Sequence, residues 1–144
     1  MTNHLKPAPK WFVPVAAIAL VWNLIGVMAF FTGPANNQAA LAELPAVQQV
    51  FFASMPTWVL IAFAIAVFAG SAGCLFLALK KRFSVILFAL SLLGIIGQQI
   101  HAFVLNDGLD IFGQNALIMP ILVLIVAIAL LQLSQYASKH HWLD

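Results

Sequence analysis

The chain has 144 residues, of which 64% are hydrophobic and only 7% are charged. A soluble domain is roughly half apolar and a quarter charged, so a soluble core of this size could not bury so much apolar surface. The composition therefore predicts an integral membrane protein of one domain. The small formal charge of +2 gives no reason to expect a nucleic-acid partner, and a single cysteine excludes an internal disulfide or a dithiol redox pair.

Four apolar segments follow one another along the chain, at residues 11–32, 57–79, 83–105 and 115–136. Each has about 20 residues, which at ~1.5 Å per residue is enough to cross ~30 Å of hydrocarbon. Lipid offers the backbone no hydrogen-bond partners outside its own helix, so the segments must be helical. The sequence predicts an all-α membrane protein with four antiparallel transmembrane helices in a lipid bilayer.

The basic residues predict the orientation of these helices. They lie only in the two tails and in the connection between the second and third segments: Lys6, Lys10, Lys80, Lys81, Arg82 and Lys139. Connections that carry Lys and Arg stay in the cytoplasm. Both termini are therefore expected to be cytoplasmic, and the connections 32–56 and 106–114, which have no basic residue, are expected to face outward.

The first outer connection has a pattern of its own. Apolar residues recur in it at helical spacing, at Leu41, Leu44, Val47, Phe51 and Met55. Pro45 can divide this stretch into two short helices or begin the second one. The favoured interpretation is a short amphipathic helix on the outer membrane surface. The alternative is a lid that covers a site between the spans.

Small residues follow one face of the second span and one face of the third: Ala62, Ala66, Gly70 and Gly73, and Ser91, Gly94 and Gly97. Such patterns let two helices approach closely in lipid. Only about three residues join the two spans, so the small-residue faces are predicted to meet. Cys74 lies beside them and is interpreted as a small buried residue.

The strongly polar residues inside the spans all fall in the outer half of the predicted bundle. Gln98 and His101 share one side of the third span, and Asn23 is just past the middle of the first. Gln99 points about 100° away from Gln98, so both are not expected to be equally central. Asn23 and Gln98 are expected to face inward and to bond across the bundle, and His101 can reach an outer-boundary group such as Asn115, or water. These side chains either hold the helices together or line an outward-facing pocket, and the sequence leaves the two readings even. The candidate ligand-binding residues are Trp22, Asn23, Gln98, His101, Asn115 and Glu43.

The predicted spans contain no Asp, Glu, Lys or Arg. No catalytic triad, phosphate-binding loop or pair of carboxylates is present, so an enzyme is not expected. The histidines have no metal-ligand spacing, and neither a metal site nor a cofactor is predicted. Pro120 falls in the first turns of the fourth span and predicts a kinked or unwound start there. The C-terminal tail is expected to lie at the inner interface through Trp142.

Four stretches together resemble a family of small bacterial inner-membrane proteins that carry the label "sugar transporter": WNLIGVMAFF (22–31), FAIAVFAGSAGCLFLALKKRFSV (63–85), LSLLGIIGQQIHAF (90–103) and FGQNALIMPILVLIVAIALL (112–131). The resemblance implies a multi-pass protein of the bacterial inner membrane that handles a small neutral solute. Four spans are few for a translocation path, so a homo-oligomer or a partner membrane protein is expected.

Three functions remain open at this stage. The first is a transporter-like or solute-binding membrane protein with an outward-facing polar pocket. The second is a non-catalytic accessory subunit of a larger membrane complex. The third is a bundle that binds a quinone or lipid, with His101 as the polar contact. A binding protein should have a cavity bounded by the first, third and fourth spans beneath the connection that carries Glu43.

Overall fold

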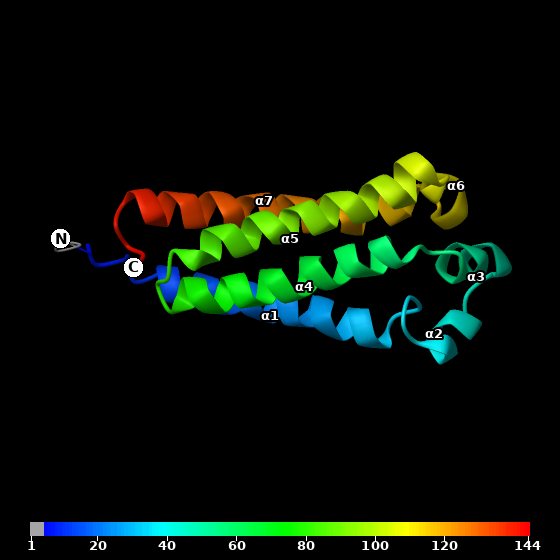
Figure 1. Cartoon of the computed structure of the whole chain (residues 1–144), viewed down its shortest axis with the longest axis horizontal. Helices are drawn as coiled ribbons and strands as arrows, with labels where there is room; N and C mark the ends of the chain where they lie inside the picture. The colour runs from blue at the N-terminus through cyan, green and yellow to red at the C-terminus, as the bar shows by residue number, and fades with distance from the viewer. Residues whose placement is uncertain (1–4) are drawn as a thin grey trace.

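The computed structural model describes residues 5–144, and within them it contains helices and turns but no strand (Figure 1). Four helices are long and apolar enough to cross a membrane, as predicted for a multi-pass membrane protein. They are α1 (Phe12–Thr32), α4 (Thr57–Ala78), α5 (Phe83–Gln99) with the π-helix η1 (Ile100–Leu105) that continues it, and α7 (Ile118–Lys139).

The short elements gather at one end of the bundle, which we name the loop end: α2 (Gln38–Ala42), α3 (Ala46–Ala53), α6 (Gly108–Phe112) and the 3₁₀ turn η2 (Gln114–Leu117) (Figure 1). The first and last described residues lie at the opposite end, the terminal end. There the Lys6 amide donates a hydrogen bond to the His141 carbonyl oxygen at 2.8 Å. Both tails therefore emerge on the same side, as four crossings require.

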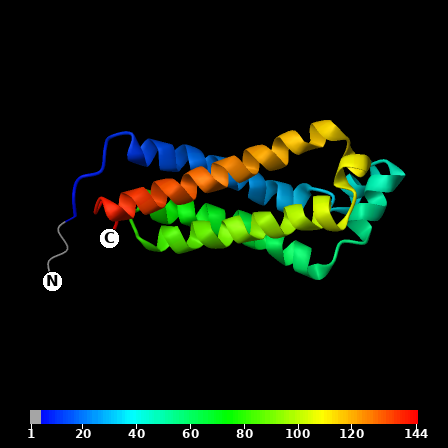
Figure 2. The same cartoon turned by 90° about the horizontal axis from the view of Figure 1, so that it is seen from above.

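The four long helices form an arc in which α1 packs on α4, α4 on α5, and α5 on α7 (Figure 2). The central contact, between α4 and α5, is made by the small residues that the sequence predicted to meet. Gly94 lies directly against the backbone of Ala62 and Ala66. The Ser91 hydroxyl donates to the carbonyl oxygen of Ala66 at 2.6 Å. The predicted close approach of these two faces is confirmed.

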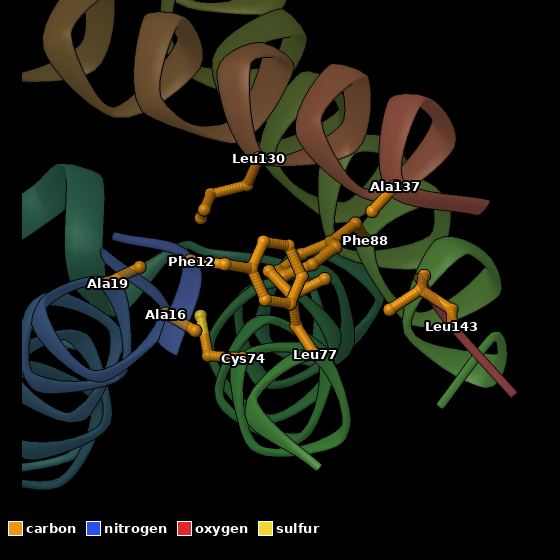
Figure 3. Close-up of a cluster of buried hydrophobic side chains, with 9 residues drawn as sticks. All are labelled: Phe12, Ala16, Ala19, Cys74, Leu77, Phe88, Leu130, Ala137 and Leu143. Carbon is orange, nitrogen blue, oxygen red and sulfur yellow. The ribbon is translucent and has the colours of Figure 1, made fainter. Parts of the chain in front are cut away.

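Apolar side chains from all four long helices meet near the terminal end (Figure 3). Phe12 of α1 lies in the middle of this cluster, among Leu77, Phe88 and Leu130. The C-terminal tail folds back onto the bundle and adds Leu143, of which only 1% is exposed. Backbone hydrogen bonds hold the tail to the bundle. The Trp142 ring packs edge-on against the rings of Trp11 and Phe12. Side chains thus close the bundle at this end.

Two connections reverse direction through left-handed residues. Lys80 follows α4 with φ of 60°, and His141 follows α7 with φ of 59°. After α4, the Lys81 amide donates to Phe76 and the Lys80 amide donates to Leu77, which is the hydrogen-bond pattern of a Schellman motif. These bonds satisfy helix-end carbonyls that would otherwise lack a partner.

The fourth span, predicted at 115–136, is a helix from Gln114 to Lys139 in which the 3₁₀ turn η2 leads directly into α7. Pro120 was expected to give a kinked or unwound start, and the fourth helix instead begins with the 3₁₀ turn η2, which is wound more tightly than an α-helix. The third span changes from α-helix to π-helix at Ile100. In the outer connection, Pro45 begins α3 and separates it from α2, and the Asn37 side chain caps α2.

Candidate functional site

A cavity of ≈ 570 Å³ lies in the half of the bundle that leads to the loop end. Its walls come from α1, α4, α5, η1 and α7, and α3 and α6 cover its end. The volume falls in the ~300–1,000 Å³ range typical of small-molecule sites. Nearly all of the wall is apolar. The polar side chains that reach it are Asn23, Gln98, Gln99 and His101.

Four of the six candidate ligand-binding residues line this cavity: Trp22, Asn23, Gln98 and His101. The other two, Glu43 and Asn115, are not among the residues that line it. Glu43 is exposed at the end of α2, which lies beside the covering helix and not over the cavity. Asn115 is exposed in the 3₁₀ turn before α7, and that turn directs its neighbour Ala116 to the cavity instead.

Asn23 is held by contacts to two helices. Its amide donates to the carbonyl oxygen of Ala19 at 2.9 Å and to the sulfur of Cys74 at 3.3 Å. The amide oxygen lies tightly against Gly70 of α4, where a β-carbon would collide with it. A separate hollow of ≈ 30 Å³, about the size of one water molecule, lies next to Asn23. The expected bond across the bundle is present, and its partner is α4.

The two glutamines exchange the roles that the sequence predicted. The amide of Gln99 donates to the carbonyl oxygen of Pro120 at 2.8 Å and so joins α5 to α7. Gln98, which was expected to make the bond across the bundle, forms no side-chain hydrogen bond with any residue in 5–144, although it also lines the cavity. Gln99 can reach a neighbouring helix because α5 packs on both α4 and α7 and so has two interior faces. The Gln98 amide lines the cavity and has no protein partner within residues 5–144.

His101 lies in η1, where the α-helical register of α5 has ended. The side chain is only 6% exposed, and it packs against Phe51 at 5.4 Å and Trp58 at 5.8 Å between ring centroids. Its Nδ1 atom is buried without a hydrogen-bond partner among the described residues. Of the two partners expected for His101, Asn115 or water, Asn115 forms no hydrogen bond with it within residues 5–144. The backbone of His101 is satisfied, because Asn106 donates to its carbonyl oxygen at 2.8 Å.

An aromatic lid, formed by Phe51 and Phe52 of α3 and Phe112 of α6, covers the cavity at the loop end. Phe112 meets Phe51 at 5.1 Å and Phe52 at 5.9 Å, both edge to face. Gln48 adds a hydrogen bond of 3.5 Å to the carbonyl oxygen of Ile111. The outer connection therefore contributes a cover to the site, which was the alternative interpretation of its amphipathic pattern.

The side of the cavity is less well closed. Within residues 5–144, α1 and α7 do not pack along their length. Ile25 of α1 and Met119 of α7 both line the cavity, yet 59% of Ile25 and 58% of Met119 is exposed. Both belong to helices long and apolar enough to span a membrane. The gap between them, which we name the side opening, therefore faces the region where lipid would lie.

Sequence reasoning missed several residues of this site, namely Gln99, Phe52, Phe112 and Met119. The amphipathic spacing around Phe51 was a usable signal for the α3 half of the lid. No comparable pattern marked Phe112. It lies in a short connection, more than sixty positions after Phe51 in the sequence. In the part of the chain that the structure describes, no group of three His, Cys, Asp or Glu side chains could hold a metal ion.

Comparison of the chain with protein-family models, curated proteins and solved structures finds no match. The functional argument therefore rests on the chemistry of the cavity.

Proposed function

We propose that this integral membrane protein binds a small lipophilic molecule that carries an uncharged hydrogen-bonding group, of the quinone or lipid type. The observation that supports the proposal is the ≈ 570 Å³ cavity with an apolar wall and a few unpaired polar groups. Among the three functions left open by the sequence, this one fits the chemistry of the wall best.

The wall favours an apolar ligand for energetic reasons. Removing apolar surface from water contributes about 25 cal/mol per Å², whereas a hydroxyl buried without a partner costs on the order of 1–3 kcal/mol. A sugar has several hydroxyls, and only four polar side chains reach the cavity. Two of these, Asn23 and Gln99, already donate to protein atoms. A mostly apolar molecule with one or two polar groups can be satisfied by the hydrogen-bonding groups that are still unpaired.

The access route points to the same class of ligand. The aromatic lid covers the loop end, and packed side chains close the terminal end. The side opening lies between Ile25 and Met119, which belong to two helices long and apolar enough to span a membrane. A ligand that uses it would arrive from the bilayer, where lipophilic molecules are concentrated.

A neutral polar solute is the second candidate. It is favoured by the resemblance to the "sugar transporter" family and by the free Gln98 amide in the cavity. If both termini are cytoplasmic, the cavity would lie in the periplasmic half of the bundle. Transport through four spans would then require a homo-oligomer or a partner membrane protein.

Ligand-induced thermal stabilisation of the detergent-solubilised protein tests the proposal. A ligand that binds only the folded state raises the unfolding temperature, and the rise grows with the logarithm of the ligand concentration relative to its dissociation constant. The probes are decylubiquinone, oleate and glucose. We expect decylubiquinone to raise the unfolding temperature and glucose to leave it unchanged.

Two neighbouring substitutions on α7 show whether the probe occupies the cavity. Val123→Phe places a larger side chain into the cavity wall, whereas Leu122→Phe adds the same ring on an exposed residue that does not line it. Val123→Phe should abolish the stabilisation and Leu122→Phe should retain it. Equal stabilisation of both variants, or stabilisation by glucose alone, would contradict the proposal.

A further inference from the structure

We infer that the ligand carries an uncharged ring carbonyl, the chemistry of a quinone head group, and that this group binds at the lid end of the cavity with His101 as its hydrogen-bond partner. The inference rests on the proposed function, because it requires the cavity to be a ligand site. It goes further by naming the chemical class of the head group and the side chain that recognises it.

The charge of the head group follows from the cavity wall. Among the described residues that line the cavity, none is Lys, Arg, Asp or Glu. A carboxylate or a phosphate placed there would lose its hydration without gaining an opposite charge, which is strongly unfavourable in an apolar environment. Fatty acids and phospholipid head groups are therefore poor occupants, and an uncharged polar group is favoured.

The position of the head group follows from His101. The side chain is more than nine-tenths buried, it lines the cavity, and it forms no side-chain hydrogen bond with any residue in 5–144. A neutral imidazole has one N–H donor and one acceptor nitrogen. Buried groups of this kind are nearly always satisfied in folded proteins. A carbonyl oxygen in the cavity would accept the bond that no protein atom receives.

Gln98 offers the head group a second hydrogen-bond donor, close to His101 along the chain. Gln98 at the end of α5 precedes His101 of η1 by three positions, both side chains line the cavity, and the Gln98 amide is also free. Because an amide supplies two N–H donors, Gln98 can serve a second oxygen on the same ring.

The shape of the head group follows from the aromatic residues around this end. Five phenylalanine side chains line the cavity: Phe51, Phe52, Phe63, Phe103 and Phe112. Aromatic rings pack favourably on one another in stacked or edge-to-face geometries. A flat ring fits between these faces better than a branched or flexible polar group. The apolar tail of such a ligand can continue to the side opening beside Ile25 and Met119.

The test compares two probes that share a decyl tail on a six-membered carbon ring: decylubiquinone, whose ring carries two carbonyls with methoxy and methyl groups, and decylbenzene, whose ring carries no polar group. Their dissociation constants are measured by thermal stabilisation in detergent for the wild-type protein, His101→Phe and His101→Gln. Phenylalanine preserves the ring that packs on Phe51 and Trp58 but removes both nitrogens. Glutamine restores an N–H donor without the ring.

We expect His101→Phe to weaken decylubiquinone binding by about 3–10-fold, the effect of one hydrogen bond, and to leave decylbenzene binding unchanged. His101→Gln should recover part of the loss. Should His101→Phe fail to fold, His101→Gln and Gln98→Leu supply the comparison, since each must change decylubiquinone binding more than decylbenzene binding.

The outcomes separate this inference from the proposed function. If both probes bind and the His101 variants affect them equally, the head-group assignment is wrong and the lipophilic cavity stands. If oleate binds more tightly than decylubiquinone, the uncharged class is wrong. If no lipophilic probe binds the wild-type protein, the proposed function and this inference both fail.

Discussion

Gly94 of α5 faces the carbonyl oxygen of Ala62 on α4 so closely that a β-carbon at position 94 would lie 2.5 Å from that oxygen. The neighbouring obstacle is also backbone, the Ala66 nitrogen at 2.9 Å, so no side chain can rotate away. Gly94→Ala should therefore force the two helices apart and lower the free energy of unfolding by about 1–3 kcal/mol. Reversible unfolding in mixed detergent measures this loss.

Gly97 provides the matched control on the same helix. A β-carbon there would meet the Ala62 side chain at 3.6 Å, which is an ordinary contact. Alanine also has the better helix propensity, by up to about 1 kcal/mol. Gly97→Ala should leave stability unchanged or raise it. If both alanine variants lose the same stability, close packing at Gly94 is not what holds α4 to α5.

The adjacent glutamines should separate stability from binding. Gln99→Leu removes the hydrogen bond to the Pro120 carbonyl oxygen and should cost about 0.6–2 kcal/mol, as interhelical bonds in membranes do. Gln98→Leu removes a side chain without such a bond, so it should leave the unfolding temperature of the unliganded protein unchanged. Melting curves of both variants without probe make the comparison, and a reversed order would show that Gln98 has the structural role.

The C-terminal tail should stabilise the protein through Leu143 and not through its ion pair. Leu143 is 1% exposed in the terminal-end cluster, so Leu143→Ala should cost about 2–4 kcal/mol. The ion pair between Lys81 and Asp144 is 3.2 Å long, but both side chains are about half exposed. Asp144→Asn should therefore change stability by less than about 0.5 kcal/mol. Chemical unfolding of the two variants decides between them.

Lys80 offers a stabilising substitution. Its left-handed backbone strains a residue that has a β-carbon, and glycine removes that strain at the C′ position of a Schellman motif. Lys80→Gly should raise stability by up to about 1 kcal/mol. Lys80→Ala removes the same charge but keeps the β-carbon, so it should give no gain. An equal gain in both variants would assign the effect to the charge.

The architecture could be predicted from the sequence because lipid leaves few alternatives to the helix. The lengths of the apolar segments predicted the four spans, and the small residues around Gly94 predicted the contact between α4 and α5. Pro45 marked the start of α3 correctly, since proline cannot donate the helical hydrogen bond.

The candidate site could be predicted only in part. Helical spacing correctly grouped Gln98 with His101, but it could not tell that α5 has a second interior face, towards α7, which Gln99 occupies. That Glu43 and Asn115 do not line the cavity has another cause. Short connections set side-chain direction through local turns, such as the 3₁₀ turn η2, and these turns depend on tertiary packing more than on hydrophobic pattern.

The unequal packing along the bundle determines which of its parts can move. The close contact between α4 and α5 forms a spine, while α1 and α7 are two outer arms whose side chains meet in the terminal-end cluster around Phe12 and Leu130. If one of these arms tilts about the terminal-end cluster, its end nearest the loop end moves most. Over a ~30 Å helix, a tilt of about 5° displaces the tip by roughly 2–3 Å. Such a tilt would change the width between the arms at the loop end while the spine stays intact.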